Sequence, residues 1–195
     1  ASYVQGRAAA IARTQRTQRH LLQRPGAAMG YDATRTSLAG LSLAGDIGRW
    51  TGPGVNYGTG GSVRTPGLEL NDLGYQTQAD FADTWAWMGV RDEVPGEVLR
   101  RWGVNASAWV GYDLSPRMTS RGGDASLHTT WKNWWQSNLR FELNHGIWQN
   151  GALRGGPSLR GDVGGRLAAD VITDARRDWV LGAKAATRYV PAGDR

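Results

Sequence analysis

Hydrophobic and polar residues alternate one by one along most of this chain. The stretch NLRFELNHGIW at 138–148 is the clearest case, with Leu139, Phe141 and Leu143 on odd positions and Arg140 and Glu142 on even ones. Successive side chains of a β-strand point to opposite faces, so this stretch predicts a strand with one apolar and one polar face.

Other segments share this period of two. Together with 135–147, we expect strands at 29–47, 50–64, 76–91, 98–112, 124–131, 159–172 and 179–189. A short additional strand fits residues 2–5. The turn-like connections DEVPGE (92–97) and DARRD (174–178) are short, which predicts antiparallel hairpins. Most of the expected strands are roughly 11 to 15 residues long, which exceeds the strands of ordinary soluble sheets.

The segment at 76–91 alternates less cleanly than the others. Phe81, Trp85 and Trp87 share one parity with Ala79, and Asp83 interrupts them. We expect the two tryptophans on the apolar face, with Asp83 as the exception.

The beginning of the chain has a different pattern. Between Gly6 and Pro25-Gly26 the chain contains no proline or glycine, and Arg13, Arg16 and Arg19 recur at helical spacing. They predict a basic helix of roughly three to four turns that ends at Pro25-Gly26. The expected organisation is therefore a short strand and helix over 1–28, followed by a β-domain over 29–195. The helix fits a plug in a barrel lumen, a contact with an anionic surface, or a solvated connection.

The apolar face of the strands could meet a protein core or a lipid bilayer, because a soluble sandwich also has one dry face. Aromatic spacing favours lipid. Trp102 and Tyr112 lie ten positions apart on one face, as do Trp179 and Tyr189. Ten residues span about 34 Å, which a tilt of ~40° reduces to about 26 Å of height, close to the ~25 Å apolar band of outer-membrane barrels. The expected membrane-interface aromatics are Trp102, Tyr112, Trp131, Trp135, Trp179 and Tyr189.

These patterns predict an all-β fold, an antiparallel up-and-down transmembrane β-barrel with one N-terminal helix, in a bacterial outer membrane. The chain would work as a channel, a receptor or an envelope scaffold. The alternative from another class is a soluble antiparallel β-sandwich that acts as a binding module.

The opposite face would line the lumen with a polar network. Its expected members are Arg101, Asn105, Asp124, His128, Arg140, Glu142, Arg160, Asp162, Arg166, Asp170, Lys184 and Arg188. Opposite charges on neighbouring strands can pair across a sheet. The network fits a solute-selective pore, a buried acid/base site or a structural set of ion pairs. No serine nucleophile motif accompanies His128, Asp124 and Glu142, so we expect no catalysis and no cofactor.

The composition and charge of the chain limit the classes of partner that we expect it to bind. The net charge is +6 and the chain has ten tryptophans, 28 glycines and no cysteine, so it forms no disulfide. The three histidines lie far apart, which predicts no metal site. Basic residues share their face with carboxylates and we expect the aromatics on the other face, which argues against nucleic-acid binding. Expected partners are outer-membrane lipid or lipopolysaccharide, other envelope proteins, or further strands of a larger barrel.

Two longer motifs resemble a known family. They are RTQRTQRHLLQRPG at 13–26 and TPGLELNDLGYQTQADFADTWAWMGV at 65–90. Two shorter elements also match, Thr34 to Ser37 and Arg154-Gly155-Gly156-Pro157. The chain is similar to the barrel region of a bacterial outer-membrane family of unknown function, whose members carry an N-terminal domain like a family-nine carbohydrate-binding module. That domain is absent from this sequence, so its sugar binding is not carried over. The resemblance implies a segment of a larger barrel, whereas length alone also permits a complete eight-stranded one.

Overall fold

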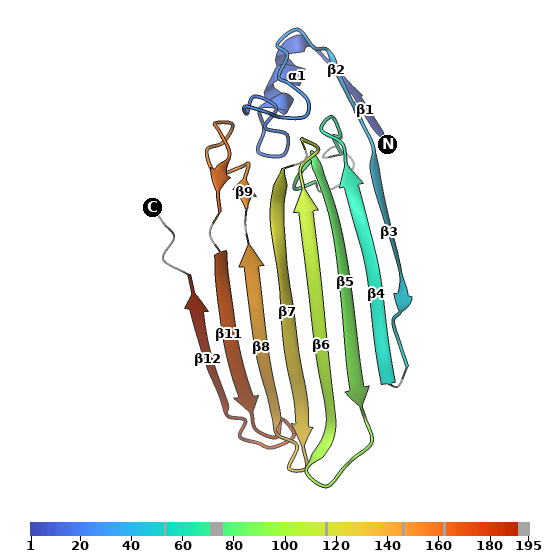
Figure 1. The fold of residues 1–195 in the computed structure, drawn as a ribbon, viewed down its shortest axis with the longest axis vertical. Helices are drawn as coiled ribbons and strands as arrows, with labels where there is room; N and C mark the ends of the chain where they lie inside the picture. Colours follow the sequence, from blue (N-terminus) through green and yellow to red (C-terminus); the bar gives the residue numbers. More distant parts are fainter. Residues whose placement is uncertain (53, 71–75, 116, 146, 162, 191–195) are drawn as a thin grey trace.

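The main element of the fold is an eight-stranded antiparallel sheet (Figure 1). The computed structural model describes residues 1–52, 54–70, 76–115, 117–145, 147–161 and 163–190. In spatial order the strands are β12 (Gly182–Tyr189), β11 (Val163–Ile172), β8 (Gln136–His145), β7 (Met118–Trp131), β6 (Leu99–Tyr112), β5 (Phe81–Asp92), β4 (Gly54–Arg64) and β3 (Ser42–Arg49). The predicted all-β fold with about eight antiparallel strands is confirmed.

Smaller elements lie outside this sheet. The strand expected at the N-terminus is present as β1 (Ser2–Gln5), which pairs with β2 (Ser37–Gly40). The expected strand at 159–172 is split, because β10 (Leu159–Arg160) pairs with β9 (Trp148–Gln149) and only β11 joins the main sheet. Strand β7 begins at Met118, six residues before the expected start at 124.

The predicted helix is much shorter than expected. Helix α1 spans only Ala8–Gln15, and Leu21 has a φ of 48°, which a helix does not allow. The amide of Leu22 donates to the carbonyl oxygen of Gln15, so the chain turns back where we expected it to continue. The reason is tertiary. His20 and Arg24 are buried against loops of the sheet, and these contacts override local helix propensity. No helix among the described residues is long and apolar enough to cross a membrane.

The strands are displaced stepwise along one another. The row of paired residues that starts at Ile47, two residues before the end of β3, runs through Thr59, Ala86, Ala108, Gly123, Leu143 and Gly165 to Tyr189, the last residue of β12. The sheet is therefore sheared, as it is when strands tilt relative to a barrel axis. In the described part of the chain β3 and β12 are the two edges, and no pairing between them closes the sheet.

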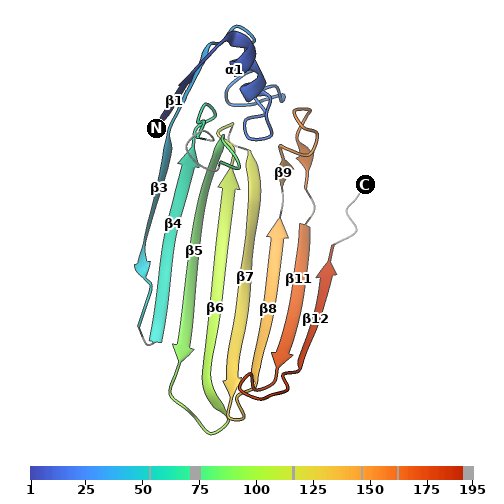
Figure 2. The same ribbon diagram turned by 180° about the vertical axis from the view of Figure 1, so that it is seen from behind.

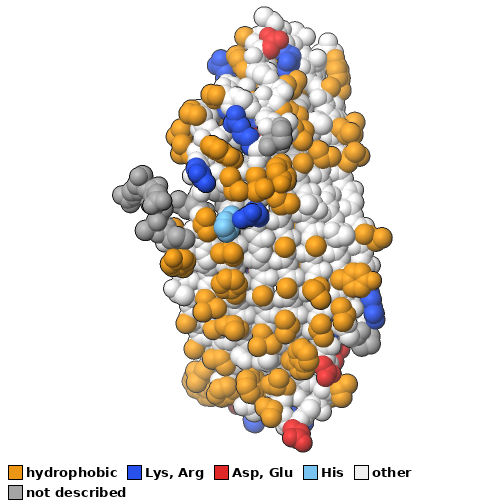
Figure 3. Space-filling view, viewed as in Figure 1, with side chains coloured by type: hydrophobic (Ala, Val, Ile, Leu, Met, Phe, Trp, Pro, Cys, Tyr) orange, Lys and Arg blue, Asp and Glu red, His pale blue; other side chains and the backbone are white. Residues whose placement is uncertain are grey.

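One face of the sheet is apolar and uncovered. Ile47 is 75% exposed, Phe141 49% and Leu167 45%, although all three are large hydrophobic residues. Figure 3 shows hydrophobic side chains distributed across the strands on this side, with few charged ones between them. An exception is the pair of Arg121 on β7 and His145 on β8, near one end of the sheet.

The tryptophans of β5 lie on the polar face, which corrects the expectation from the sequence. Trp85 pairs with Trp109 and Trp87 pairs with Ser107. On β6 these partners alternate with Ala106 and Ala108, which lie on the apolar face and pair with Met88 and Ala86. Aromatic character suggested the wrong face, and Asp83, which seemed an exception, shares the face of the two tryptophans.

The buried hydrophobic core lies at one end of the sheet. Ile11, Leu22 and Leu38 form it, packed against partly buried residues that include Met29 and Tyr31. Figure 2 shows the N-terminal segment, which we define as residues 6–36, at the end of the sheet where the long connections lie. The opposite end has the shorter turns. The N-terminal segment thus covers one end of the sheet and leaves most of both faces open.

The close contact between β2 and the loop after β4 provides a test of the packing. A Cβ atom on Gly40 would lie 2.2 Å from the amide nitrogen of Leu68, whereas a Cβ on Gly45 of β3 would meet nothing within 4 Å. We expect Gly40→Ala to lower the free energy of unfolding by about 1–3 kcal/mol, because backbone cannot move aside as a side chain can. Denaturant unfolding measures this, with Gly45→Ala as the matched control. Equal effects of the two substitutions would contradict the packing described.

Candidate functional site

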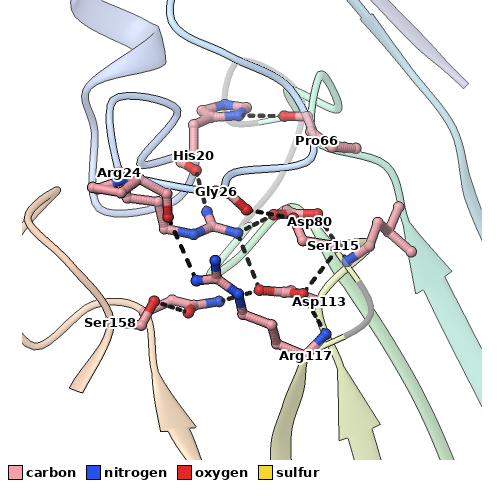
Figure 4. Close-up of polar contacts among 12 residues, drawn as sticks. His20, Arg24, Gly26, Pro66, Asp80, Asp113, Ser115, Arg117 and Ser158 are labelled. Atoms are coloured by element: carbon pink, nitrogen blue, oxygen red, sulfur yellow. Dashed lines mark hydrogen bonds and ion pairs between the residues drawn. The ribbon is translucent and has the colours of Figure 1, made fainter. Parts of the chain in front are cut away.

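The best-enclosed polar site of the described chain joins the N-terminal segment to the end of the sheet. At its centre Arg24, only 4% exposed, forms ion pairs with Asp80 and Asp113 (Figure 4). Asp80 directly precedes β5 and Asp113 directly follows β6. One guanidinium therefore connects the N-terminal segment to two different strands. We call Arg24, Asp80, Asp113 and Asn150 the Arg24 cluster.

Backbone amides position the two carboxylates. Asp113 Oδ1 accepts hydrogen bonds from the amides of Ser115 and Arg117, both at 3.0 Å. Asp80 Oδ1 accepts one from the amide of Leu114 at 3.1 Å. These bonds belong to the β6–β7 turn, so the turn orients both carboxylates through contacts that do not involve Arg24. Buried charges need such additional hydrogen bonds to compensate for the loss of water.

Asn150 links a third connection to the cluster. Its Nδ2 donates to Asp113 Oδ2 at 3.0 Å, and its Oδ1 accepts from Ser158 Oγ at 2.6 Å. Asn150 and Ser158 belong to the connection that contains β9 and β10. Connections before β5, after β6 and after β8 thus meet at one point.

Further bonds fasten the N-terminal segment around Arg24. Ser115 Oγ donates to the carbonyl oxygen of Gly26 at 2.6 Å. The His20 ring lies 2.9 Å from the carbonyl oxygen of Pro66 through Nδ1 and 3.1 Å from Glu69 Oε2 through Nε2. Gln15, fully buried, donates to and accepts from the backbone of Asp32 at 2.8 and 2.9 Å, which closes the segment on itself.

A cavity of about 310 Å³ adjoins the Arg24 cluster. Its lining comes from the N-terminal segment, the approach to β5, the start of β7 and the β9 region, and includes Arg19, Gln78, Ser120 and Trp148. The site therefore consists of buried ion pairs beside a polar hollow. The Arg24 cluster attaches the N-terminal segment to the sheet, because Arg24 and the amide donors already bind both carboxylates.

Sequence analysis missed this site. Asp113 stands just outside the alternating segment 98–112, Asp80 has the polar parity of the segment 76–91 and so did not stand out, and Arg24 appeared only as part of a motif. A buried arginine is recognisable only once its partners are known. Residues 71–74, which form the NDLG element of the second motif, lie outside the described residues.

Most of the expected lumen residues share the polar face of the sheet. Paired positions place Arg188, Arg166, Glu142 and Asp124 in one row, and Lys184, Asp170, Asn138 and His128 in another. Arg140 pairs with Ser126 and Ser126 with Asn105 in the row between them. Arg101 joins the same face, where its Nε donates to Thr130 Oγ1 at 3.0 Å.

Few of these residues contact one another directly. Arg140 Nη2 lies 3.4 Å from Asp124 Oδ2, with the arginine largely exposed. Asn138 donates to Asp170 Oδ2 at 2.7 Å, and its Oδ1 lies 2.6 Å from His128 Nδ1. Such exposed ion pairs contribute little to stability. Arg160 lies on β10, outside the main sheet, and Asp162 is outside the described residues.

The expected interface aromatics gather at strand ends. Tyr112 and Tyr189 are the last residues of β6 and β12, and Trp131 is the last of β7. Trp102 lies within β6, whereas Trp135 immediately precedes β8. Trp179 lies three residues before β12, so its spacing to Tyr189 does not measure one continuous strand.

A second charged cluster lies among the turns at the opposite end. Trp134, with a φ of 67°, has the guanidinium carbons of Arg100 and Arg176 each 3.7 Å from its ring centroid. Arg176 also binds Asp174 through two hydrogen bonds of 2.8 and 2.7 Å. The hydrogen bonds from Arg176 lower the pKa of Asp174 from 3.8 to about 2.

Comparison with protein-family models, with characterised proteins and with solved structures found no match to this chain. The family resemblance expected from the motifs therefore stays a prediction.

Removal of the central cation tests the Arg24 cluster. We expect Arg24→Met to lower the free energy of unfolding by about 3–5 kcal/mol, because two buried carboxylates would lose their counter-ion. Adding Asp80→Asn and Asp113→Asn should recover part of the loss, since the carboxylates are then neutral. Urea unfolding measures the change, and limited proteolysis reports release of the N-terminal segment. Arg13→Met, an exposed position on α1, is the matched control. Equal behaviour of the two arginine variants would exclude an anchoring role.

The lowered pKa of Asp174 predicts how the stability of the folded chain depends on pH. A carboxyl group with a lowered pKa stabilises the folded chain fully above its ordinary pKa of 3.8, and loses this contribution as the pH falls through about 2. Wild-type chain should therefore be more stable than Asp174→Asn at pH 6, and the difference should narrow towards pH 2. Thermal unfolding of both proteins across this range provides the measurement. A difference that stays constant between pH 6 and pH 2 would refute the assignment.

Proposed function

We propose that this chain forms part of the wall of an outer-membrane β-barrel. In this proposal the apolar face meets lipid, the polar face lines a water-filled lumen, and the N-terminal segment covers one mouth. The carrying observation is the apolar sheet face that no protein layer covers in the described part of the chain. Soluble monomers rarely expose apolar patches larger than a few hundred Å².

One row of the sheet illustrates this face. Leu139, Leu127, Val104, Val90 and Val55 follow one another across β8, β7, β6, β5 and β4. Four of these five residues are exposed to solvent, with exposed fractions from 37% for Leu127 to 45% for Leu139. A continuous apolar band of this kind needs a non-aqueous neighbour, and a lipid bilayer provides one along its whole width.

Strand dimensions support the same proposal. β6 and β7 have 14 residues each, and β5 has 12. A tilted strand crosses a bilayer with about 9–11 residues. The stepwise displacement of the strands is also the arrangement that barrel closure requires. The basic pair Arg121 and His145 stands at the end of the apolar face nearest the N-terminal segment, where anionic headgroups of lipid or lipopolysaccharide would lie.

A soluble β-sandwich fits less well. It needs a second sheet about 10 Å from the apolar face. Among the described residues the remaining strands form only two-stranded pairs of four and two residues. Neither is large enough to cover eight strands, so the apolar face would remain in water.

The two sheet edges decide how the barrel is completed. An unpaired strand edge in lipid leaves amide and carbonyl groups without partners, at several kcal/mol for each. Strands β3 and β12 are such edges within the described chain. We therefore propose that further strands pair with them, from a longer parent chain or from an assembly, and that transport belongs to that complete barrel.

Two adjacent residues of β7 test the assignment of the faces. We expect Leu127→Arg to destabilise the chain in liposomes by about 2–4 kcal/mol, as arginine does near the bilayer midplane. Ser126→Arg should have a much smaller effect, because its guanidinium would remain in water on the polar face. Urea unfolding from liposomes measures both changes. Equal losses would reject the facing assignment, and a wild-type chain that is folded and monodisperse without detergent would reject the membrane proposal.

A further inference from the structure

Four tryptophans share the polar face of the sheet, and three of them, Trp50, Trp85 and Trp87, lie close together. Trp85 and Trp87 belong to β5, Trp109 to β6, and Trp50 follows β3. The Trp50 ring centroid lies 6.0 Å from that of Trp85 and 5.4 Å from that of Trp87. All four are at least partly exposed. We call these four residues the tryptophan surface.

Glycines form the floor under these rings. Trp87 pairs with Gly58, Trp85 with Gly60, and Trp109 with Gly122 on the neighbouring strands. A Cβ atom on any of these glycines would come within 2.5 to 2.8 Å of the paired indole. The indoles therefore lie over the adjacent strands and do not stand upright from the sheet. This geometry leaves part of each ring open to the solvent side.

Polar groups border the tryptophan surface. Asp46 lies beside Gly60, and Asp83 stands two residues before Trp85 on the same face and binds Ser62. Asn56 is on the same face of β4 and only 5% exposed. Its Nδ2 donates to the carbonyl oxygen of Gly52 at 3.1 Å, but its Oδ1 has no hydrogen-bond partner among the described residues. That atom has almost no accessible surface, so the acceptors open to a ligand are the carboxylates of Asp46, which is exposed, and Asp83, which is partly exposed.

We propose that the tryptophan surface binds a neutral oligosaccharide. The C–H faces of sugar rings are apolar and flat enough to stack on indoles, which are large apolar surfaces with a polar edge. Sugar hydroxyl groups would donate to the carboxylates of Asp46 and Asp83. Favourable packing between aromatic and glycine neighbours in a sheet explains each pair by itself, but it does not explain why Trp50 also lies against Trp85 and Trp87.

Other ligands fit this geometry less well. A quaternary ammonium group needs aromatic faces that surround it. Here Trp50 lies against Trp85 and Trp87, and the rings form an open surface. A nucleic-acid strand would bring phosphates close to Asp46 and Asp83, which repel them. The inference concerns only the polar face, so it holds whichever phase the apolar face meets.

Calorimetric titration of the folded chain with maltohexaose, cellohexaose and chitohexaose tests the proposal. We expect saturable binding of at least one hexasaccharide, weakened roughly tenfold or more by Trp85→Leu, as for a central aromatic contact. Trp179→Leu, at a site 84% exposed and outside the strands, is the matched control and should bind as wild type does. Circular dichroism verifies folding, and Trp50→Leu, which lies outside the strands, replaces Trp85→Leu if that variant does not fold.

Three outcomes would overturn the proposal. The first is that the folded wild-type chain binds none of the hexasaccharides. The second is that the tryptophan-surface variants bind as wild type does, and the third is that choline competes for the site. The first excludes an oligosaccharide site, the second a role of the tryptophan surface, and the third identifies a cation site in place of a sugar site.

Discussion

The whole structure depends on a sheet whose two faces differ in polarity, and in the described part of the chain no protein layer covers the apolar face. In a soluble domain a second layer buries such a face and supplies most of the stability. Here the buried hydrophobic core is confined to the N-terminal segment and the residues it touches. The sheet itself is held by backbone pairing between eight strands.

The Arg24 cluster is where this sheet becomes connected to the rest of the chain. Three connections from different strands meet at one buried guanidinium, although the segment that carries Arg24 comes some 50 residues or more before its partners in sequence. Taking these charges out of water is unfavourable, and only the complete set of ion pairs and amide donors compensates for it. Specific attachment of the N-terminal segment at one position follows, because a displaced segment would leave carboxylates unpaired.

The two sets of side chains on the polar face divide it into regions. Charged residues dominate β7, β8, β11 and β12, whereas tryptophans over glycines dominate β4 to β6. A sheet face with an aromatic region and a charged region can contact a solute by stacking in one region and by electrostatics in the other. The division arises from the register, since Gly58 and Gly60 lie opposite the two indoles of β5.

Local alternation in the sequence determined the number of strands, most of their positions and the two faces of β6, β8 and β11, because the side-chain period of a strand is a property of the backbone. Tertiary structure decided the rest. Trp85 and Trp87 were assigned to the apolar face because hydrophobicity describes a residue alone, and only pairing with Trp109 and Ser107 shows which side they occupy. Helix α1 ends at Gln15 because the following residues reach the Arg24 cluster, whose carboxylates come from distant loops. Contacts between residues so far apart leave no periodic signal, so they become visible only when the chain is folded.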